Sequence, residues 1–599
     1  AAKATYGRKG DKIVQMNYDA IDAGAKQVVE IQVPDSWKSC PDEGLFTPEV
    51  KDGREDVVAF VKNIQSKVNS QEGNNLPVSA FVDYADGSTP SGSAEYEKRG
   101  IAVDIPVWKS ENCVQCNRCA YVCPHAVIRP VALTEEELAK APEGTEAIDM
   151  IGMPGLKFTM TVSAYDCTGC GSCVNVCPGK KGEKALVMEN MEANAGSQKA
   201  FDFGREIEVK PEVVAKFKPA TVKGSQFKQP LLEFSGACAG CGETPYAKLV
   251  TQLFGDRMYI ANATGCSSIW GNSSPSTPYT VNAKGQGPAW SNSLFEDNAE
   301  FGYGMLLGQK AIRKRLKAEV ETIAASDKAS AEVKAACQEY LDTFNCGASN
   351  GDATDKLVAA LDGCDCDTCK DIVKNKDFLA KKSQWIFGGD GWAYDIGFGG
   401  VDHVLASGED INIMVFDTEV YSNTGGQASK ATKTGATAQF AAGGKETKKK
   451  DLAGIAMSYG YVYVAQIAMG ADYNQTVKAI AEAEAYPGPS LIIAYAPCIN
   501  HGIKKGMSKA QTEEQLAVEC GYWNNFRFNP AAEGAKFTLD SKEPKEEGYQ
   551  EFLDGEVRYN ALKRSNPEKA ARLFKKNEQE AMERYEYLKK LVTLYGTEE

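Results

Sequence analysis

The sequence predicts an α/β protein in which a doubly wound domain is joined to a smaller α+β domain. Residues 385–416 read as strand, glycine-rich turn, helix and strand, the order found in doubly wound parallel sheets. Residues 113–178 contain two closely spaced runs of cysteine, which predict a separate metal-binding module. The chain of 599 residues is long enough for several such domains.

The first part of the chain, residues 1–54, is expected to be the tail of a preceding α/β domain. It mixes proline and glycine with short apolar runs, of which Lys12–Met16 and Val28–Val33 are predicted to be strands. The chain begins Ala1-Ala2-Lys3 without a methionine, so we expect a piece of a longer protein.

Residues 55–95 are expected to form a helix and a linker. Glu55–Val68 is compatible with a helix, and Asp86–Ser93 is rich in glycine, serine, threonine and proline. A ferredoxin-like module is then expected at residues 96–210, with an insert between its two cysteine runs. Thr134–Ala139 in that insert is predicted to be a helix capped by its threonine.

Each cysteine run reads C-x2-C-x2-C-x3-C-P, the pattern of ferredoxins that hold two [4Fe–4S] clusters. In such proteins three cysteines of one run share a cluster with the fourth cysteine of the other run. Zinc is the alternative, but zinc sites favour two well-separated pairs of ligands. We therefore predict electron transfer. The ligands would be Cys113, Cys116, Cys119 and Cys177 for one cluster, and Cys167, Cys170, Cys173 and Cys123 for the other.

Composition excludes several classes of function. The net charge of −14 argues against nucleic acid as a partner. No apolar run approaches the length of a membrane span, which argues against a membrane partner. Nineteen cysteines in so large a chain, at least eight of them used for metal, indicate a reducing, cytoplasmic location.

The second signature is a glycine-rich turn after a predicted strand. The strand Trp385–Phe387 leads into Gly388-Gly389-Asp390-Gly391, and Gly397–Leu405 is compatible with a helix before the next strand, Ile411–Phe416. Glycines let a backbone approach a phosphate closely, and a carboxylate such as Asp390 suits Mg2+.

A polar cluster at residues 417–426 follows that second strand, and adjacent parallel strands would bring it beside Asp390. The two segments match the GDG motif of thiamine diphosphate enzymes in their spacing, except that Thr418 stands where most such enzymes place an asparagine. A structural turn in some other α/β domain is the alternative.

The chain resembles the pyruvate:ferredoxin oxidoreductase family, also called pyruvate synthase, and specifically its carboxy-terminal half. The resemblance covers nearly the whole chain. It is carried by residues 97–100 (EKRG), the two cysteine runs, 236–246 (GACAGCGETPY), 263–269 (ATGCSSI), 388–397 (GGDGWAYDIG), 417–432 (DTEVYSNTGGQASKAT) and 497–502 (PCINHG). Within this family the threonine at position 418 is the rule.

The resemblance implies ligands that spacing alone would not reveal. A third, proximal [4Fe–4S] cluster would be held by Cys238, Cys241, Cys266 and Cys498. Mg2+ on the diphosphate would be held by Asp390, the Thr418 hydroxyl and the Val420 carbonyl. Thiamine would contact Glu243, Cys266, Asp390, Gly391, Trp392, Ala393, Thr418, Glu419, Val420, Tyr421, Ser422 and Asn423, and the residues named as catalytic are Asn423, Cys266 and Glu243.

The resemblance also implies the fold and the reaction. Residues 211–599 would be a thiamine-diphosphate-binding doubly wound domain with the proximal cluster and carboxy-terminal helices. Pyruvate and coenzyme A would give acetyl-CoA and CO2, and three [4Fe–4S] clusters would pass the electrons to ferredoxin or flavodoxin. Substrate contacts would come from amino-terminal domains absent here, in a homodimer. The alternatives are another 2-oxo acid as substrate, or an electron-transfer subunit inactive alone.

Other features remain open. Ala311–Lys382 is expected to be a helical excursion, and Pro567–Leu594 an amphipathic helix that either contacts a neighbouring subunit or is solvated. In the excursion, Cys364, Cys366 and Cys369 with Cys346 could bind a metal, although free thiols are favoured. We further expect ordinary thiols at Cys40, Cys337 and Cys520, a structural histidine at His403 and a loop-orienting one at His501. His125 is expected to be a surface residue, with tuning of the nearby cluster by a hydrogen bond as the alternative. Lys448, Lys449 and Lys450 are expected to form a solvated face, with binding of coenzyme A phosphates or an acidic ferredoxin as the alternative.

Overall fold

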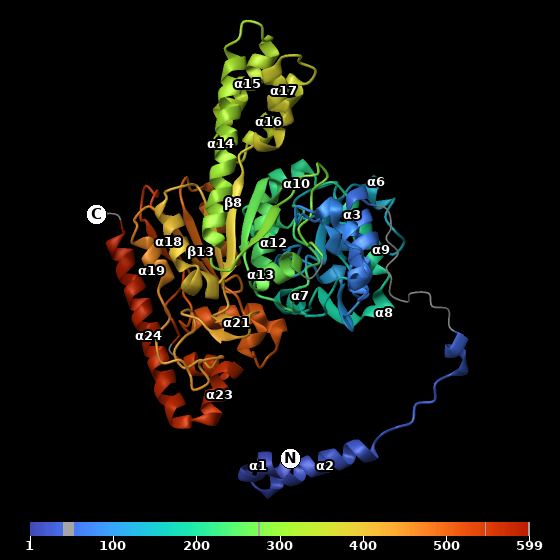
Figure 1. The fold of residues 1–599 in the computed structure, drawn as a ribbon, viewed down its shortest axis with the longest axis vertical. Coiled ribbons are helices and arrows are strands. Elements are labelled where there is room, and N and C mark those ends of the chain that lie inside the picture. The colour runs from blue at the N-terminus through green and yellow to red at the C-terminus, as the bar shows by residue number, and fades with distance from the viewer. Residues whose placement is uncertain (40–52, 274–275, 546, 597–599) are drawn as a thin grey trace. The chain divides into compact units, whose positions relative to one another are not determined.

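The computed structural model describes residues 1–39, 53–273, 276–545 and 547–596 (Figure 1). The chain divides into two compact units, residues 1–49 and 50–599, and each is described by itself. Cys40 lies outside the described residues. Among the described residues, no helix is long and apolar enough to cross a membrane.

The first unit is helical where strands were expected. Lys12–Met16 lies inside helix α2, and residues 28–33 have no regular structure, so both strand predictions are wrong. Short apolar runs do not distinguish a strand from a helix, and Val28, Val29 and Ile31 are exposed rather than packed in a sheet. The elements are α1 (Ala2–Tyr6), η1 (Gly7–Lys9), α2 (Asp11–Lys26) and η2 (Asp35–Ser39).

The second unit opens with the predicted helix, which contains a π-helical turn: α3 (Glu55–Phe60), η3 (Val61–Gln65) and α4 (Ser66–Asn69). The expected linker at Asp86–Ser93 has irregular structure, but its end is anchored to the rest of the unit. Ser93 is buried, and its hydroxyl accepts a hydrogen bond from the Thr277 amide at 2.9 Å. Short 3-10 turns flank it: η4 (Gly73–Asn75), η5 (Val78–Tyr84) and η6 (Ser93–Tyr96).

The cysteine-rich module is an α+β fold. Strand β1 (Asp104–Trp108) pairs antiparallel with β5 (Leu186–Asn190), and the insert forms a second sheet in the order β2-β4-β3. The predicted helix in the insert is present, with Thr134 accepting from the Glu137 amide at 3.1 Å. The remaining elements are η7 (Ser110–Asn112), α5 (Arg118–Tyr121), β2 (Ile128–Leu133), α6 (Glu135–Leu138), β3 (Ile148–Asp149), β4 (Lys157–Val162), α7 (Ser172–Val176), α8 (Met191–Asn194), α9 (Ser197–Glu206), α10 (Pro211–Lys216) and α11 (Val222–Ser225).

The main sheet has eight strands in the order β15-β14-β12-β13-β9-β8-β6-β7. The six strands from β12 to β7 are parallel, and β14 and β15 add an antiparallel edge. The predicted strands are β8 and β9, which are neighbours. The bounds are β6 (Met258–Ala263), β7 (Ala289–Ser293), β8 (Ser383–Gly389), β9 (Asn412–Asp417), β12 (Tyr463–Ile467), β13 (Ser490–Tyr495), β14 (Phe526–Phe528) and β15 (Phe537–Leu539).

Alternate residues of the central strands enter two different cores, as expected for a sheet covered on both faces. On β8, Ile386 belongs to one core, whereas Trp385 and Phe387 belong to the other. The first core also receives α14, α18, α19 and α24, and the second receives α12 and α20. These and smaller elements are α12 (Thr244–Phe254), η8 (Gly255–Arg257), α13 (Cys266–Ser268), η11 (Gly391–Ile396), α18 (Phe398–Ala406), β10 (Val420–Tyr421), β11 (Gln427–Ala428), α19 (Leu452–Met457), α20 (Tyr473–Ala485), η12 (Ile499–His501), η13 (Met507–Lys509) and α21 (Ala510–Glu519).

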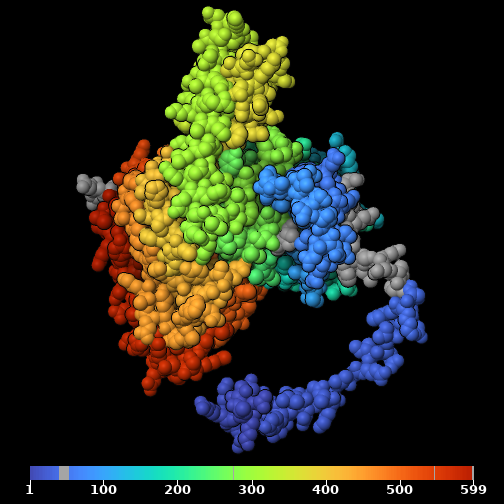
Figure 2. All heavy atoms as spheres, viewed as in Figure 1, coloured from blue at the N-terminus to red at the C-terminus, as the bar shows by residue number. Residues whose placement is uncertain are grey.

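The helical excursion projects from this sheet (Figure 1 and Figure 2). Its first helix, α14 (Asn298–Ala324), starts in the sheet core at Ala299 and ends in a separate core at Ile323. The excursion is therefore helical, as predicted, and has its own small hydrophobic core. Its other helices are α15 (Ala331–Thr343), α16 (Asn350–Leu361), α17 (Asp367–Lys374) and η10 (Lys376–Phe378).

The last helix, α24 (Pro567–Leu594), has the predicted bounds. Its apolar residues, among them Leu573, Leu588 and Leu591, pack into the sheet core of the same chain. Its opposite face, which includes Lys575 and Lys590, is exposed, as the solvated-surface alternative expects, and the contact with a neighbouring subunit stays a prediction. It follows α22 (Tyr549–Asp554) and α23 (Val557–Ser565).

Candidate active site and metal centres

Two small cavities in the cysteine-rich module are each lined by four cysteines among other residues. One cavity is lined by Cys113, Cys116, Cys119 and Cys177, and the other by Cys123, Cys167, Cys170 and Cys173. Each cavity therefore takes three cysteines from one run and the fourth cysteine from the other run. This is the crossed arrangement that the sequence spacing predicts.

The two runs share one backbone conformation. Gln115 and Asn117 have positive φ angles of 54° and 60°, and Gly169 and Gly171 occupy the same two places in the second run with 66° and 74°. Amide groups point at sulfur in both turns, with Gln115 N donating to Cys113 Sγ and Gly169 N to Cys167 Sγ, each at 3.4 Å. Such N–H···S bonds stabilise bound thiolates.

Burial makes several of these thiols poor acids without a metal. It raises the pKa of Cys167 to about 12 and the pKa of Cys173 well above its usual range. A bound metal replaces the proton and holds the thiolate form. Two observations therefore support these eight cysteines as cluster ligands: the crossed lining of the two cavities, and the burial of thiols that a metal would keep deprotonated.

His125 is buried, so the expectation of a surface histidine was wrong. Its ring lines the second cavity, and Nδ1 lies 3.1 Å from the Ser235 carbonyl oxygen, to which it donates. Burial lowers the pKa of His125 to about 4, so the ring is neutral at physiological pH. His125 thereby links the cysteine loop to the stretch that leads toward Cys238. His403, by contrast, is exposed on α18.

The module is fastened directly to the sheet domain. Asn175 donates to the Ser508 carbonyl at 2.8 Å, and Tyr121 OH donates to the Tyr473 carbonyl at 3.1 Å. Lys248, buried on α12, donates to the Tyr121 carbonyl at 3.1 Å. Helix α12 thus spans the distance between the end of α5, which carries Cys119, and the loop that contains Cys241.

A second group of candidate residues gathers at one edge of the main sheet. The neighbouring parallel strands β13, β9, β8 and β6 are followed respectively by Cys498, Thr418, Asp390 and Cys266. Carboxyl ends of parallel strands meet at the same edge, which is where doubly wound sheets bind ligands. The loop with Cys238 and Cys241 joins them, because Gly242 N donates to the Pro497 carbonyl at 3.2 Å.

Hydrogen bonds join three oxygen atoms at this edge, at distances that neighbouring ligands of one small cation would also have. Thr418 Oγ1 lies 3.1 Å from Asp390 Oδ1 and 3.0 Å from the Val420 carbonyl oxygen. Adjacent oxygens of a Mg2+ octahedron, with bonds of about 2.0–2.1 Å, lie roughly 2.9–3.0 Å apart. Asp390 is fully buried, and burial together with nearby Asp417 raises the pKa of its carboxyl well above the usual range.

The glycines of the turn are required mainly by aromatic side chains of the chain itself. A Cβ on Gly388 would lie 2.3 Å from the Trp392 ring, and one on Gly391 would lie 2.5 Å from the Tyr421 ring. Gly389 differs, since its Cβ would meet only the Phe416 carbonyl oxygen, at 3.9 Å. The close approach to a phosphate that we expected of all these glycines is therefore open only at Gly389.

The remaining thiamine-site candidates lie on both sides of Asp390. Glu243 is buried, accepts a hydrogen bond from Trp270 Nε1 at 2.8 Å, and has its pKa raised to about 7 by burial. Cys266 Sγ lies 3.0 Å from Ser422 Oγ. Asn423 is exposed in the turn that follows.

The pKa shifts of Cys266 and Cys498 reflect the other cysteines near this edge. Burial raises the pKa of Cys266 far above its usual range, and Glu243, Cys241 and Cys498 add to the rise. Burial likewise raises the pKa of Cys498 to about 12, with a contribution from Cys238. The four cysteines that the resemblance assigned to a proximal cluster therefore lie near one another, and their role as ligands stays a prediction.

Lys449 belongs to a buried ion network rather than to a solvated face, so that expectation was wrong for this residue. Its Nζ lies 2.7 Å from Asp417 Oδ2 and 3.1 Å from Glu419 Oε1, and Arg558 reaches the other Glu419 oxygen at 2.9 Å. Burial alone would raise the pKa of Glu419, but Lys449 and Arg558 hold it far below its usual range. No signal in the lysine run distinguishes Lys449 from its exposed neighbour Lys448.

His501 connects two of the strand ends. Its Nε2 lies 2.7 Å from the Thr418 carbonyl oxygen, and its Nδ1 lies 3.5 Å from the Cys498 amide. Burial lowers its pKa to about 3, so the ring is neutral, with Nε2–H as donor and Nδ1 as acceptor. It thereby holds the Cys498 loop against the Thr418 loop, as the sequence suggested.

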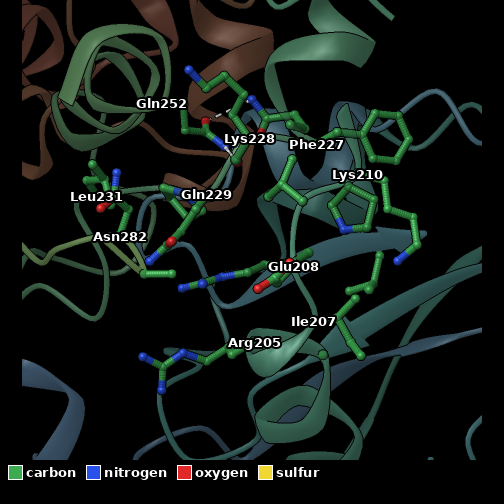
Figure 3. Close-up of a pocket in the computed structure, with 18 of the residues that line it drawn as sticks. Arg205, Ile207, Glu208, Lys210, Phe227, Lys228, Gln229, Leu231, Gln252 and Asn282 are labelled. Carbon is green, nitrogen blue, oxygen red and sulfur yellow. Dashed lines mark hydrogen bonds between the residues drawn. The ribbon is translucent and has the colours of Figure 1, made fainter. Parts of the chain in front are cut away.

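A separate cavity of about 500 Å3 lies beside the module and is not lined by any of the predicted site residues (Figure 3). Several of the cationic side chains that line it already have acidic partners. Arg205 contacts Glu233 at 3.0 Å, and Lys210 contacts Glu137 at 2.7 Å. Fewer cations are therefore available to bind an anionic ligand in this cavity than the number of lysines and arginines lining it suggests.

Three family models match the chain. They are a 4Fe-4S dicluster domain at residues 112–181, the carboxy-terminal thiamine pyrophosphate binding domain of thiamine pyrophosphate enzymes at 376–494, and a domain of unknown function named EKR at 48–102. The chain therefore carries an iron–sulfur domain and a thiamine-binding domain, in the places where the two signatures lie.

Curated relatives match over nearly the whole chain. A pyruvate-flavodoxin oxidoreductase of Enterobacter agglomerans and a pyruvate:ferredoxin oxidoreductase of Moorella thermoacetica are each 55% identical over 602 residues, covering 98% of this chain and 50% of the relative. A pyruvate-flavodoxin oxidoreductase of Klebsiella pneumoniae is 50% identical over 598 residues, covering 99% of this chain and 50% of the relative.

The chain thus spans about half the length of the curated relatives it matches. Among solved structures, a 2-oxoglutarate:ferredoxin oxidoreductase from Magnetococcus marinus matches with a TM-score of 0.26 at 16% identity, covering 44% of this chain and 65% of that one, which is too weak to support a conclusion. The sequence relatives and the two cofactor domains agree: the chain belongs to the family of pyruvate-flavodoxin and pyruvate:ferredoxin oxidoreductases.

Proposed function

We propose that this chain is the cofactor-binding and electron-transfer part of an enzyme that oxidises pyruvate with coenzyme A to acetyl-CoA and CO2. Ferredoxin or flavodoxin would accept the electrons, in line with the names of its relatives. The observation that carries the proposal is the meeting of Asp390, Thr418, Cys266 and Cys498 at one sheet edge, because it sets a thiamine-type motif beside a group of four cysteines.

Thiamine diphosphate, when bound, supplies the reactive carbon that decarboxylation of a 2-oxo acid requires. Asp390, Thr418 and the Val420 carbonyl would hold Mg2+ on the diphosphate, and the 3.0–3.1 Å spacing of their oxygens supports this assignment. Ser429 keeps Asp390 in place by donating to Oδ2 at 2.5 Å. The backbone at residues 390–393 and 418–423 would complete the cradle.

Glu243, Cys266 and Asn423 would face the reacting part of the cofactor. Glu243 can take up or release a proton near neutral pH, because burial raises the pKa of its carboxyl group to about 7. Trp270 fixes the orientation of that carboxyl group by its hydrogen bond of 2.8 Å. Asn423, which is exposed, is positioned to meet a substrate that arrives from outside this chain.

Three [4Fe–4S] clusters would form the electron path. The proximal one would be held by Cys238, Cys241, Cys266 and Cys498, and the other two would occupy the cavities of the module. The Cys266–Ser422 contact of 3.0 Å would place the proximal cluster beside the thiamine segment. Helix α12 and Lys248 hold the module against this segment, which keeps the path short.

We further propose that the chain works with amino-terminal domains of the same enzyme, in a homodimer. The relatives are about twice as long as this chain, and the missing half would supply substrate contacts and the glutamate that activates thiamine. Whether those domains belong to the same polypeptide or to a separate one does not alter the roles proposed for the residues above.

The decisive experiment counts cofactors on anaerobically purified chain. We expect about twelve iron atoms and twelve sulfides, as three cubanes require, together with one thiamine diphosphate and one Mg2+ per chain. Pyruvate decarboxylation should be weak with the chain alone and strong after addition of the amino-terminal half. Colourless protein with zinc at the cysteines would refute the proposal, and full activity of the chain alone would refute the need for the missing half.

A further inference from the structure

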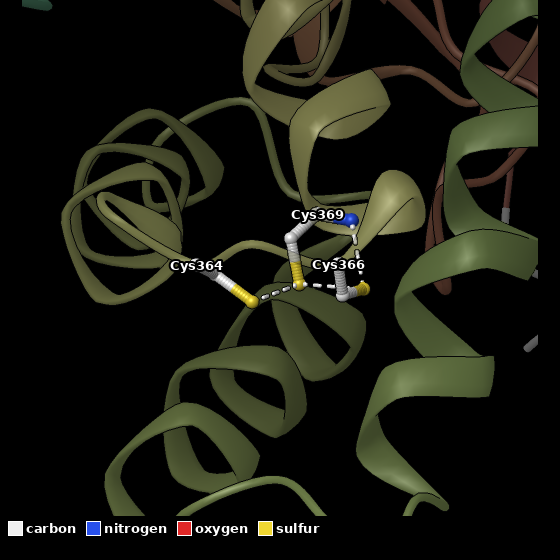
Figure 4. Close-up of side chains that lie close together, drawn as sticks. All are labelled: Cys364, Cys366 and Cys369. Carbon is white, nitrogen blue, oxygen red and sulfur yellow. Dashed lines mark hydrogen bonds between the residues drawn. The ribbon is translucent and has the colours of Figure 1, made fainter.

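Three thiols converge in the helical excursion, apart from both cluster sites and from the sheet edge. Cys364 lies in the loop after α16, Cys366 is the N-cap of α17, and Cys369 lies in the first turn of that helix. Cys369 Sγ is 2.9 Å from Cys364 Sγ and 3.2 Å from Cys366 Sγ (Figure 4). All three sulfurs lie within 4.8 Å of one another.

This spacing suits a single ion and not a cluster. Ligands of one ion share a common centre, whereas the thiolates of a cubane bind four different irons and stand further apart. Within the described part of the chain, this trio is the one group of three or more histidine, cysteine or carboxylate ligand atoms found within 4.8 Å of one another. The cysteines lining the two module cavities do not form such a group.

The local backbone prepares the site for thiolates. Gly363, with φ of 75°, reverses the chain after α16, and the resulting C-x-C-x2-C segment wraps all three sulfurs around one point. The Cys369 amide donates to Cys366 Sγ at 3.3 Å. That sulfur also lies at the N-terminus of α17, where the helix dipole favours negative charge.

Burial distinguishes the three sulfurs. Cys369 is buried in the small core of the excursion, Cys364 is partly buried against that core, and Cys366 is exposed. The inner sulfurs would anchor an ion to the core, and the exposed one leaves a path for entry. A tetrahedral zinc site with Zn–S bonds of about 2.3 Å sets its sulfurs roughly 3.8 Å apart, so a small outward rotation of the side chains suffices.

The other candidates fit less well. A disulfide would use two of the thiols and leave the third without a role. Cys346 cannot complete the set, because α16, twelve residues long, separates it from the trio by roughly 18 Å. Free thiols were favoured from the sequence, but the sequence did not show that three sulfurs share one point.

We propose that Cys364, Cys366 and Cys369 bind one zinc ion, whose fourth position faces solvent. Zinc is the common divalent ion that three thiolates and one water satisfy without redox chemistry. The ion would fasten the loop between α16 and α17 to the core of the excursion. The site shares no residue with the proposed enzyme function and stands or falls independently of it.

The test measures zinc and iron on the full chain with its clusters loaded. Anaerobic protein is dialysed against Zn2+ buffered by a chelator, and both metals are counted by mass spectrometry. We expect about one zinc per wild-type chain and three sulfur neighbours at about 2.3 Å in X-ray absorption at the zinc edge. Cys366→Ser should lower the bound zinc about tenfold and leave the iron content unchanged.

Two features keep the test informative. Cys366 is exposed, so its replacement by serine leaves the core intact, and Cys346→Ser provides a matched exposed cysteine in the same excursion that should keep its zinc. Equal zinc in wild type and Cys366→Ser would overturn the proposal. So would fewer than three sulfur neighbours, a loss of iron in Cys366→Ser, or a Cys364–Cys369 disulfide in protein that refuses zinc.

Discussion

The cysteine-rich module and the edge of the main sheet collect cofactor ligands in opposite ways. In the module, each cavity takes three cysteines from seven consecutive residues, 113–119 or 167–173. At the sheet edge, Cys266, Asp390, Thr418 and Cys498 come from the ends of four strands that are distant in sequence. The first arrangement is encoded locally, whereas the second exists only once the sheet has formed.

The difference extends to what holds each region together. Five of the cluster cysteines are themselves members of the module core, so the expected metal is part of its packing. The two cores of the sheet are built mainly from aliphatic and aromatic residues and contain none of the predicted ligand cysteines, and Cys266 only borders one of them. We therefore expect metal to stabilise the module and the fold to position the ligands at the sheet edge.

The largest effect should come from removing a cluster ligand in each region. Cys173→Ser and Cys266→Ser should each cost about four irons per chain. Only Cys173→Ser should also loosen the surrounding fold, measured as faster amide hydrogen exchange in β1 and β5. Cys266→Ser should abolish electron transfer to ferredoxin in the complete enzyme and keep both module clusters visible by EPR. All three EPR signals in Cys266→Ser would remove Cys266 from the ligand set.

The next effect concerns the oxygen ligands. Asp390→Asn keeps the shape of the side chain but removes the charge, so Mg2+-dependent thiamine diphosphate affinity should fall at least about 100-fold, or about 2.7 kcal/mol. Calorimetric titration measures this, and iron content should not change. Asp402→Asn on the following helix, where the carboxylate bonds Tyr459 instead, is the control. Unchanged affinity in Asp390→Asn would contradict the assigned Mg2+ ligands.

These two regions also differ in how much of their structure local sequence patterns predict. The cluster pattern and the strand–turn–helix–strand unit depend on local spacing, and α24 has the bounds that its periodicity indicated. Cys266 and Cys498 carry no local signal, and only resemblance to a family placed them together. The prediction for Lys449 was wrong because a lysine run looks the same whether or not one member pairs with buried carboxylates.

The errors follow the same logic. Lys12–Met16 was expected to be a strand, but its apolar residues also fit a helix, and no local rule separates the two. The convergence of Cys364, Cys366 and Cys369 depends on a turn set by Gly363 and on the packing of α17. Contacts decided by tertiary packing were therefore the ones that the sequence left open.

The buried carboxyl group of Glu514 allows a test of the packing around the main sheet. Glu514 accepts a hydrogen bond from the Gly470 amide at 2.6 Å and contacts Tyr246 OH at 3.2 Å, and burial raises its pKa from the usual 4.5 to about 8. The folded state keeps this proton where the unfolded chain has lost it. Its contribution to stability is therefore fully present below pH 4.5 and is lost as the pH rises to about 8.

Glu514→Gln should remove this dependence, because the amide does not titrate. Relative to the variant, the free energy of unfolding of the wild type should fall by about 1 kcal/mol per pH unit between pH 5 and 8. Chemical denaturation at several pH values measures the difference. Glu519→Gln, on the same helix but paired with Lys545 at the surface, should show no such slope. Parallel curves for wild type and Glu514→Gln would mean that Glu514 is already ionised in the folded protein.

The smallest effect compares the two cysteine runs with each other. The first run adopts the left-handed conformation with side chains present. Gln115 compensates by bonding the insert, donating to the Asp149 carbonyl and accepting from the Ile151 amide, each at 2.8 Å. The second run uses glycine. A Cβ on Gly169 would lie 3.1 Å from the Asp104 carbonyl, whereas one on Gly171 would meet only Ser508 Cβ at 3.8 Å.

Alanine at either glycine should therefore cost about 1–2 kcal/mol from the left-handed conformation, with Gly169→Ala at the upper end because of its contact with Asp104. Gly171→Asn should cost less than Gly171→Ala, because asparagine tolerates this conformation and Asn117 already occupies the matching place in the first run. Anaerobic denaturation followed by cluster absorbance measures the three variants. Equal losses of stability in Gly171→Asn and Gly171→Ala would contradict this equivalence of the two runs. Glycine would then be required at position 171 because Ser508 lies close to it, and not because of its φ angle.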